Sequence, residues 1–496
     1  MNFNSIQFLI FLPIVSTLYF LIPYQLRWLW LLLASCYFYM AFIPVYILIL
    51  FLLICIDYVM GILIERSYGL QRKFYLIVSI FSTCLILFIF KYFNFFNANL
   101  TNLAQFLHWN YSVKSLSLIL PIGLSFHTFQ SLGYVIEVYQ GKWKAERNFG
   151  VYAVYVMFFP QLVSGPIERA RNLLPQFYEK HDFDYQRIAD GLKLILWGLF
   201  QKVVIADRLA LLVNQVYGNL PQYQGLPLLI ATVFFAFQIY CDFSGYSDIA
   251  IGSAQIFGFR LMRNFNQPYF ATSIADFWKR WHISLSTWFR DYVYIPLGGN
   301  KTSKIRWTFN IIITFLISGL WHGANWTYLI WGALHGTYYL FSSWTKGFRE
   351  NIVQVLRLNR WIFFHRLLKT LITFSLVCFA WIFFRAKSIQ EAGYVIRHLF
   401  NGWNDPLVWD AQQAGYLGLQ KSEFVGAILV VIFLLAAHVL EQKLSGKMES
   451  CSSMRNTLSF LNQKPVLFRW MVYIGMTLAI MNLGVMANVP FIYFQF

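Results

Sequence analysis

Two histidines stand in dense polar and aromatic sequence within an otherwise apolar chain. His282 lies in DFWKRWHISLSTWFRDYVYIPLGGN, and His322 lies in ISGLWHGANWTYLIWGALHG. Burying an ionisable imidazole among membrane-depth segments costs free energy that packing alone does not return. Both histidines are therefore candidates for catalytic chemistry.

His322 is placed where two apolar segments meet, followed by Gly323. Gly319 and Gly323 would let another backbone or a substrate come close. An imidazole with an unperturbed pKa near 6.5 is suited to take a proton from an alcohol while an acyl group arrives. His335 lies about 220° further around an ideal helix, so we expect it to face elsewhere and to be structural.

The segment around His282 has helical periodicity. Trp278, His282, Leu285 and Phe289 recur at the spacing of one helical stripe, which predicts a single amphipathic helix over 274–294. Such a Trp-rich helix would lie in the membrane interface or dip into it as a re-entrant piece. The alternative is an ordinary surface helix whose histidine has only a structural role.

A third polar segment reads QIYCDFSGYSDIAIGSAQIFGFRLMRNFNQ and precedes the His282 segment. Its carboxylates, Asp242 and Asp248, flank Gly245, which would permit a bend. Carboxylates at this depth line a wet cavity or pair with basic partners. Lining a cavity and capping or joining a broken helix are both open for these two residues.

The composition indicates a polytopic membrane protein. Of 496 residues, 58% are hydrophobic and 12% charged, against about 25% charged in soluble proteins. Apolar runs long enough to enter or cross the hydrocarbon core predict an all-α fold of about 11–13 transmembrane or re-entrant helices. These runs are 6–21, 28–42, 45–64, 74–90, 116–138, 151–163, 192–213, 228–240, 309–320, 326–340, 367–384, 424–440 and 470–489. The first run lacks a basic region and a cleavage site, so it is predicted to be a helix rather than a signal peptide.

The charge pattern predicts a topology. The net charge of +18 would suggest nucleic acid in a soluble protein, but here the basic residues cluster in loops beside apolar runs, as the positive-inside rule requires. Basic stretches at 260–306 and 346–369 are predicted to be cytoplasmic, which places the bend at His322 deep in the membrane or toward the outer face. The amino terminus and 405–413 are expected outside.

Several other classes of site are not indicated. No cysteine spacing suggests a disulfide frame or a metal site, and no G-x-S-x-G, HExxH or dinucleotide-binding motif is present. Nor is there an internal repeat or a linker to a soluble domain. We expect one membrane domain over 1–496, with amino-terminal helices in 1–115, a catalytic core in 116–345 and carboxyl-terminal helices in 346–496.

Taken together, the segments resemble one known family. The two histidine segments, QIYCDFSGYSDIAIG, SFHTFQSLGYVIEVYQGK and FFPQLVSGPIER follow the order seen in the membrane-bound O-acyltransferase (MBOAT) superfamily. The resemblance covers roughly residues 1–490 and is strongest to the bacterial branch that acetylates alginate, peptidoglycan and cellulose. It implies a ring of helices around a thinned centre, with a cytosolic donor funnel and an outer acceptor funnel that meet at the histidine.

The resemblance makes His322 the catalytic histidine and His282 the second histidine of the site. Acyl transfer from a thioester needs a base, an environment that stabilises the oxyanion, and exclusion of water. The candidate polar partners, besides His282, are Trp321, Trp281 and Asn325. Asp242 is a further candidate substrate-binding residue.

The substrates and partners follow from the same resemblance. We expect an O-acetyltransferase in the bacterial cytoplasmic (inner) membrane, with no bound cofactor or metal. The donor would be acetyl-CoA or another acyl thioester, and the acceptor an extracytoplasmic polysaccharide, reached directly or through a periplasmic acetyltransferase or esterase-like partner. Membrane lipid is the other expected partner, and nucleic acid is not one.

Three alternatives stay open. Arg290, Lys301 and Lys304 could receive an anionic donor at the cytoplasmic mouth or could only hold the topology. The protein could be a D-alanyl transferase of the teichoic acid type. A proton-coupled transporter would also place histidines and aspartates at membrane depth, but it should show an inverted repeat, and the His282/His322 pair has no counterpart in the amino-terminal half.

Overall fold

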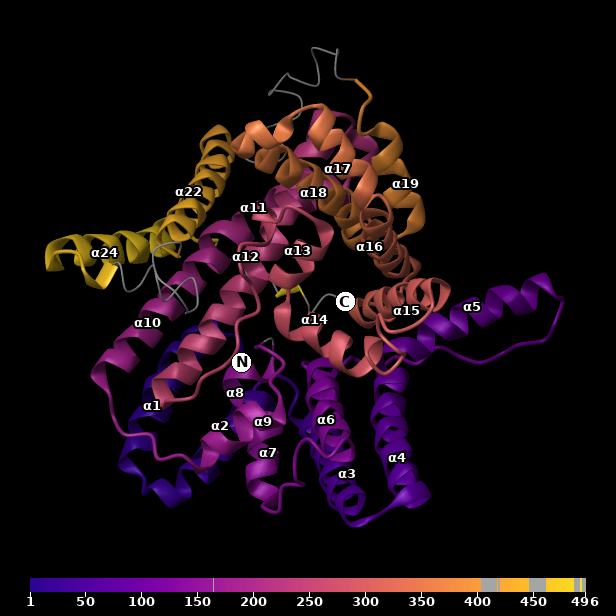
Figure 1. The fold of residues 1–496 in the computed structure, drawn as a ribbon. Helices are drawn as coiled ribbons and strands as arrows, with labels where there is room; N and C mark the ends of the chain where they lie inside the picture. The colour runs from indigo at the N-terminus through magenta and orange to yellow at the C-terminus, as the bar shows by residue number, and fades with distance from the viewer. Residues whose placement is uncertain (164, 403–416, 418–419, 446–460, 486–490, 493–496) are drawn as a thin grey trace. The chain divides into compact units, whose positions relative to one another are not determined.

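The computed structural model describes residues 1–163, 165–402, 417, 420–445, 461–485 and 491–492. Regular structure in these residues is helical throughout, and no strand occurs among them (Figure 1). The helices of the first half are α1 (Ile6–Leu21), α2 (Arg27–Met40), α3 (Ile47–Arg66), α4 (Gly69–Leu87), α5 (Phe93–Phe106), α6 (Leu124–Tyr139), α7 (Phe149–Met157), α8 (Phe159–Leu162), α9 (Ala170–Leu173), α10 (Tyr185–Leu199), α11 (Asp207–Gly218) and α12 (Leu226–Phe257). Those of the second half are α13 (Ile274–Arg280), α14 (Ile283–Phe289), α15 (Lys304–His322), α16 (Trp326–Trp344), α17 (Lys346–Val355), α18 (Ile362–Arg385), α19 (Ile389–His398), α22 (Lys421–Ser445) and α24 (Val466–Leu483).

The polytopic all-α class predicted from composition is confirmed. Within the described ranges, six helical segments are long and apolar enough to cross a membrane. They are Pro44–Arg66, Gly69–Phe106, Leu226–Phe257, Ile362–Arg385, Lys421–Lys443 and Val466–Leu483. The other apolar runs form shorter or more polar helices.

Two expected apolar runs fold differently from the prediction. The run 116–138 is helical only from Leu124, because Gly123 adopts the left-handed conformation (φ 75°) and begins α6. The run 151–163 is divided between α7 and α8 at Phe158, and Pro160 is accommodated in the first turn of α8.

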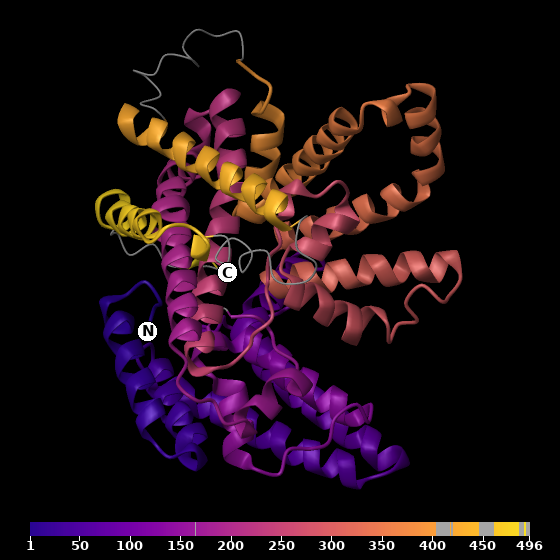
Figure 2. The ribbon, with the colours of Figure 1, turned by 60° about the vertical axis from the view of Figure 1, so that its left-hand side comes forward.

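One compact unit of the structure comprises Met1–Ile195 and Ile249–Met262. In it α3 packs against α4 and α6, and α2 packs against α7 and α1. The indigo helices α1 and α2 lie side by side in Figure 2. A buried carboxylate, Asp57, accepts a hydrogen bond from the Ser79 hydroxyl at 2.6 Å and so ties α3 to α4.

The second compact unit comprises Leu196–Asp248 and Arg263–Phe496, and it contains both histidine segments. Helices α15 and α16 form a closely packed pair, and α16 packs in turn on α18 and α13 (Figure 1). This pair is the hairpin expected around His322. The division of the chain at residues 115 and 345 stays a prediction.

Helix α12 runs without a break through the polar segment around Gly245, so the predicted bend is wrong. A Cβ atom at Gly245 would lie 2.6 Å from the Gly198 carbonyl oxygen. Gly245 is needed because the backbone at the end of α10 passes directly against α12. The two carboxylates of this segment therefore project from a continuous helix.

Candidate active site

His322 is the last residue of α15 and is 3% exposed. The chain leaves the helix in extended conformation at Gly323 and enters α16 three residues later. A Cβ atom at Gly319 would lie 2.2 Å from the Tyr328 carbonyl oxygen, and one at Gly323 would lie 2.1 Å from the Tyr328 ring. Both glycines therefore let α15 and α16 pack closely next to the histidine, the close approach of another backbone that these residues predicted.

Aromatic rings surround the His322 imidazole. The ring centroids of Trp321, Trp331 and Phe384 lie 4.8, 4.9 and 5.1 Å from its own, and all three meet it edge to face. These rings come from α15, α16 and α18, which excludes bulk water from the imidazole on several sides.

His282 does not lie inside a helix, so the predicted continuous helix over 274–294 is wrong. It stands between α13 and α14 with φ 40° and ψ 58°, the left-handed conformation. A residue in this conformation cannot continue a right-handed helix, and for a non-glycine residue it costs of order 1–3 kcal/mol. After α14 the chain forms a π-helical turn, Arg290–Tyr294.

The break turns the His282 side chain into the core, where it is completely buried. Its ring meets Phe243 of α12 edge to face at 4.5 Å and lies 6.1 Å from the indole of Trp321. Trp321 therefore contacts both imidazoles, at 6.1 Å from His282 and 4.8 Å from His322. The structure thus brings together His282, Trp321 and His322, which the sequence had placed on separate segments.

Two other predicted residues have structural contacts. Trp281 stacks on Phe277 at 5.6 Å and packs on Trp381 at 5.1 Å, so it forms part of the wall of the aromatic cluster. Asn325 is the N-cap of α16: its side-chain oxygen accepts from the Thr327 N–H at 3.1 Å, and its amide donates to the Lys387 carbonyl at 2.8 Å. These bonds hold the turn that follows His322.

Asp242 is held in a buried ion triad. Lys202 Nζ lies 2.8 Å from Asp242 Oδ1 and 2.7 Å from Asp207 Oδ1, and all three side chains are buried. The second carboxylate oxygen of Asp242 accepts from the Ile492 N–H at 2.8 Å. The preceding residue, Phe491, packs on Tyr246 with ring centroids 4.3 Å apart. Of the two roles open for Asp242, the geometry favours the structural one.

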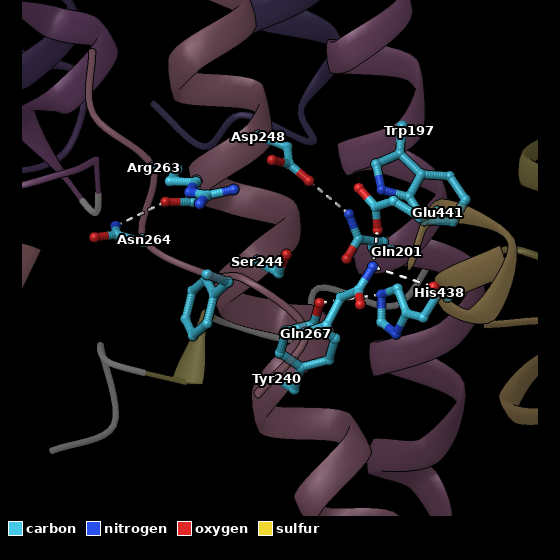
Figure 3. Close-up of a pocket in the computed structure, with 12 residues that line it drawn as sticks. Trp197, Gln201, Tyr240, Ser244, Asp248, Arg263, Asn264, Gln267, His438 and Glu441 are labelled. Carbon is cyan, nitrogen blue, oxygen red and sulfur yellow. Dashed lines mark hydrogen bonds between the residues drawn. The ribbon is translucent and has the colours of Figure 1, made fainter. Parts of the chain in front are cut away.

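Asp248, by contrast, lines a polar pocket between α12, the loop after it and α22 (Figure 3). Gln201 donates to its Oδ2 at 2.7 Å. Across the pocket, Gln267 donates to Glu441 and to the His438 carbonyl oxygen. Both carboxylates of the pocket therefore have amide donors.

A basic groove contains part of the predicted donor site. Arg290 and Lys304 line it, together with Tyr294, Ile295, Asn300, Thr302, Trp307 and Tyr339. Lys301 is exposed and is not among the lining residues. Arg290 is partly neutralised by Asp291, whose Oδ1 lies 2.8 Å from its Nε. Whether this groove binds the donor stays a prediction.

We expected His335 to face away from the site, but it does not. Its ring lies 4.9 Å from the same Trp331 indole that contacts His322. The helical-wheel estimate failed because the helix ends at His322 and a new one begins at Trp326. His335 is completely buried and stacks nearly parallel to Phe277 at 6.0 Å.

Sequence reasoning missed the aromatic residues that contact the two imidazoles, namely Phe243, Trp331 and Phe384. It also missed Trp381, which packs on this cluster, and the loop residue Asn264, which bonds the chain after His282. They stand in apolar runs or a loop, where an aromatic or an amide gives no local signal of its neighbours. In the described part of the chain, no set of three or more His, Cys, Asp or Glu side chains is placed to hold a metal ion.

An imidazole at a helix end, enclosed by aromatic rings in a membrane protein, is suited to group transfer away from water. The model of the MBOAT, membrane-bound O-acyltransferase family matches residues 147–389, which include both histidines. The chain belongs to this family and is an O-acyltransferase.

Several named relatives are similar over most of the chain. It is 35% identical to the probable alginate O-acetylase AlgI of Azotobacter vinelandii, over 100% of both chains. Identity to the probable alginate O-acetylase AlgI of Pseudomonas aeruginosa is 39%, over 90% of this chain and 84% of the relative. The peptidoglycan O-acetyltransferase of Helicobacter pylori is 35% identical, over 80% of this chain and 79% of the relative.

Proposed function

We propose that this enzyme transfers an acetyl group from a cytoplasmic thioester to hydroxyl groups of an extracytoplasmic polysaccharide. The observation that carries the proposal is the packing of His282 and His322 on the same indole, that of Trp321, inside a buried aromatic cluster. The names of the relatives, O-acetylases of alginate and of peptidoglycan, support acetyl as the group and a polysaccharide as the acceptor.

In the proposed reaction His322 is the general base. It takes the proton of the attacking hydroxyl as the new carbon–oxygen bond forms at the thioester carbonyl. The carbon–sulfur bond then breaks, and the proton passes to the departing sulfur. No net proton is gained or lost, so the site needs no connection to bulk water, whose entry would hydrolyse the thioester.

The oxyanion that develops on the carbonyl requires a hydrogen-bond donor placed before the reaction begins. We assign this role to the indole N–H of Trp321 or to His282, because both side chains are buried and belong to the same cluster as His322. Asn325 and Trp281 are assigned to support rather than to contact with substrate, since the former caps α16 and the latter packs on Trp381.

The basic groove is proposed as the entry of the donor. Acetyl-CoA and a phosphopantetheine-bearing carrier are both polyanionic, and Arg290 and Lys304 would raise their local concentration. The aromatic residues Tyr294, Trp307 and Tyr339 in the same groove offer rings on which a nucleotide base could stack. Cytoplasmic placement of this groove follows from the positive-inside rule.

Transfer to the polysaccharide is proposed to occur at the outer face of the bacterial cytoplasmic membrane, directly or through an extracytoplasmic protein of the acetyltransferase or esterase class. The relay is part of the proposal because His322 is buried, which restricts the access of a polymeric acceptor to its imidazole. An assay with and without an extracytoplasmic extract distinguishes the two routes.

The test uses inverted membrane vesicles that contain the enzyme and enclose alginate oligosaccharides. Acetyl-CoA labelled in its acetyl group is added outside, where the cytoplasmic face is exposed. We expect alkali-labile label on the oligosaccharide with wild-type protein and not with His322→Ala. Label that enters as intact solute, with no ester formed, would overturn the proposal and favour a transporter.

A second candidate is D-alanyl transfer to teichoic acid. The chain is 30% identical to the teichoic acid D-alanyltransferase of Bacillus subtilis, over 55% of this chain and 71% of the relative. The same assay with a D-alanyl thioester in place of acetyl-CoA separates the two. Faster transfer of D-alanine than of acetyl would favour this second reading.

A further inference from the structure

Asn264 hydrogen-bonds to the chain immediately after His282. Its carbonyl oxygen accepts from the Ile283 N–H at 2.8 Å, and its side-chain Oδ1 accepts from the Ser284 hydroxyl at 2.6 Å. Both bonded groups lie within two residues of the histidine. Asn264 is 1% exposed and Ser284 completely buried, so neither bond competes with water.

The other end of the Asn264 side chain is fixed to α12. Its Nδ2 donates to the Ser247 hydroxyl at 2.7 Å, the bond drawn as a dashed line from Asn264 in Figure 3. Ser247 is 2% exposed. Through this one amide, the turn at His282 is held against the part of α12 that belongs to the same compact unit, 226–248.

The same loop also fixes the chain before His282. The Asn266 N–H donates to the Arg280 carbonyl oxygen at 2.9 Å. The loop therefore bonds the backbone on both sides of the Trp281–His282 step, where the helix is interrupted. A left-handed histidine persists only where the surrounding structure over-determines it, and these bonds supply that constraint.

The same helix fixes the ring as well as the backbone. Phe243, one turn before Ser247 on α12, meets the His282 ring edge to face at 4.5 Å. Through Ser247 and Asn264, α12 sets the backbone of the histidine, and through Phe243 it sets the imidazole plane. Contacts with one helix, α12, therefore fix the position of His282 relative to Trp321.

We propose that Asn264 is a positioning residue for acyl transfer, which holds the left-handed turn so that the His282 imidazole stays on Trp321. This proposal rests on the proposed function. It assigns to Asn264 no contact with substrate, since both atoms of its amide are bonded to Ser247 and Ser284.

The test is a double-mutant cycle between Asn264→Leu and His282→Ala, measured as maximal rate and apparent donor KM. Asn264→Leu keeps the approximate volume and removes the side-chain bonds. We expect its maximal rate to fall about 10- to 100-fold with donor KM changed by less than about 3-fold, as a misplaced catalytic group does. In the His282→Ala background the same change should add less than about 3-fold, because the histidine it positions is already gone.

A matched control is Asn97→Leu in the other compact unit. Asn97 is also buried, and its side chain bonds the Val113 carbonyl and the Tyr111 hydroxyl. It should lower the thermal unfolding midpoint without this pattern of non-additivity. If the rate losses of Asn264→Leu and His282→Ala multiplied in the double variant, the role of Asn264 would be purely structural and the proposal would be overturned. An unchanged rate in Asn264→Leu would overturn it as well.

If Asn264→Leu does not fold, Ser284→Ala and Ser247→Ala decide the question, because each removes one partner of the same amide. Each should slow transfer about 3- to 10-fold in wild type and not in His282→Ala. Multiplying losses again overturn the positioning role. A wild-type enzyme that transfers no acetyl would instead overturn the proposed function, so the two failures are distinguishable.

Discussion

The indole of Trp331 lies 4.9 Å from the imidazole of His322, and the two ring planes meet at 83°. The same indole stacks on Trp381 of α18, with ring centroids 5.8 Å apart. Helix α18 therefore holds the Trp331 ring in place against His322. A contact of this kind restrains the plane of the imidazole through ring packing.

His322→Ala should leave a folded, membrane-inserted protein whose acyl transfer is reduced by about 10²- to 10⁴-fold, the usual contribution of a positioned general base. The measurement is the initial rate of labelled ester formation per folded enzyme, compared with His365→Ala on α18 as a control. Near-full activity at normal abundance would show that His322 is not the base. Loss of protein rather than rate would indicate a structural histidine.

Trp331→Phe should lower the maximal rate several-fold, because the smaller ring contacts His322 over less area. Trp344→Phe on the same helix is the matched control, since Trp344 is 63% exposed and lies outside the cluster. Trp331→Ala should in addition lower stability by about 3–5 kcal/mol through the cavity it creates. Equal rates for Trp331→Phe and Trp344→Phe would show that the Trp331 indole has no role in catalysis.

The sequence was sufficient for the features set by local composition and spacing. The apolar runs predicted an all-helical membrane protein, and the glycines at 319 and 323 predicted the close packing around His322. The break at His282 was not predictable, because the left-handed turn depends on hydrogen bonds to Asn264, which lies in a preceding loop. Periodicity alone favoured a continuous helix there.

The different surroundings of Asp242 and Asp248 could not be predicted from the sequence either. Both carboxylates stand in the same polar segment, yet one meets Lys202 and the other lines a pocket with Gln201. Which carboxylate of α12 meets a cation is decided by how the preceding segment, which carries Gln201 and Lys202, packs against the helix. No property of the segment itself distinguishes the two residues.

Lys202→Met should destabilise the protein, because it leaves Asp207 and Asp242 as buried carboxylates without their cation. Removing one partner of a buried ion pair costs about 3–5 kcal/mol. The measurement is the thermal unfolding midpoint in detergent, with Asp242→Asn expected to have a smaller effect since the Lys202–Asp207 pair remains. If Asp242→Asn kept full stability and lost turnover, Asp242 would belong to the reaction site.

The charge pattern predicts that Lys304 is cytoplasmic and that Asp410, which lies outside the described residues, is extracytoplasmic. In a background without native cysteines, a membrane-impermeant thiol reagent added to intact cells should modify Asp410→Cys and spare Lys304→Cys. Permeabilised cells are the control, in which both should react. Modification of the Lys304 probe from outside would reverse the orientation of the donor groove.

Lys304→Glu should raise the apparent KM for the thioester donor several-fold at low ionic strength, with maximal rate and insertion nearly unchanged. The reason is that Lys304 lines the basic groove together with Arg290, and a reversed charge there repels a polyanion. Lys301→Glu changes the net charge equally, three residues earlier in the chain, but Lys301 lies outside the groove lining, so its effect should be smaller. Added salt should reduce the difference in KM between Lys304→Glu and wild type. At an ionic strength of about 0.15 M, the interaction between exposed charges more than about 8 Å apart is largely screened. Equal effects of the two substitutions would indicate a general field rather than a binding groove, and an unaltered donor KM in both would leave these lysines with topology as their only role.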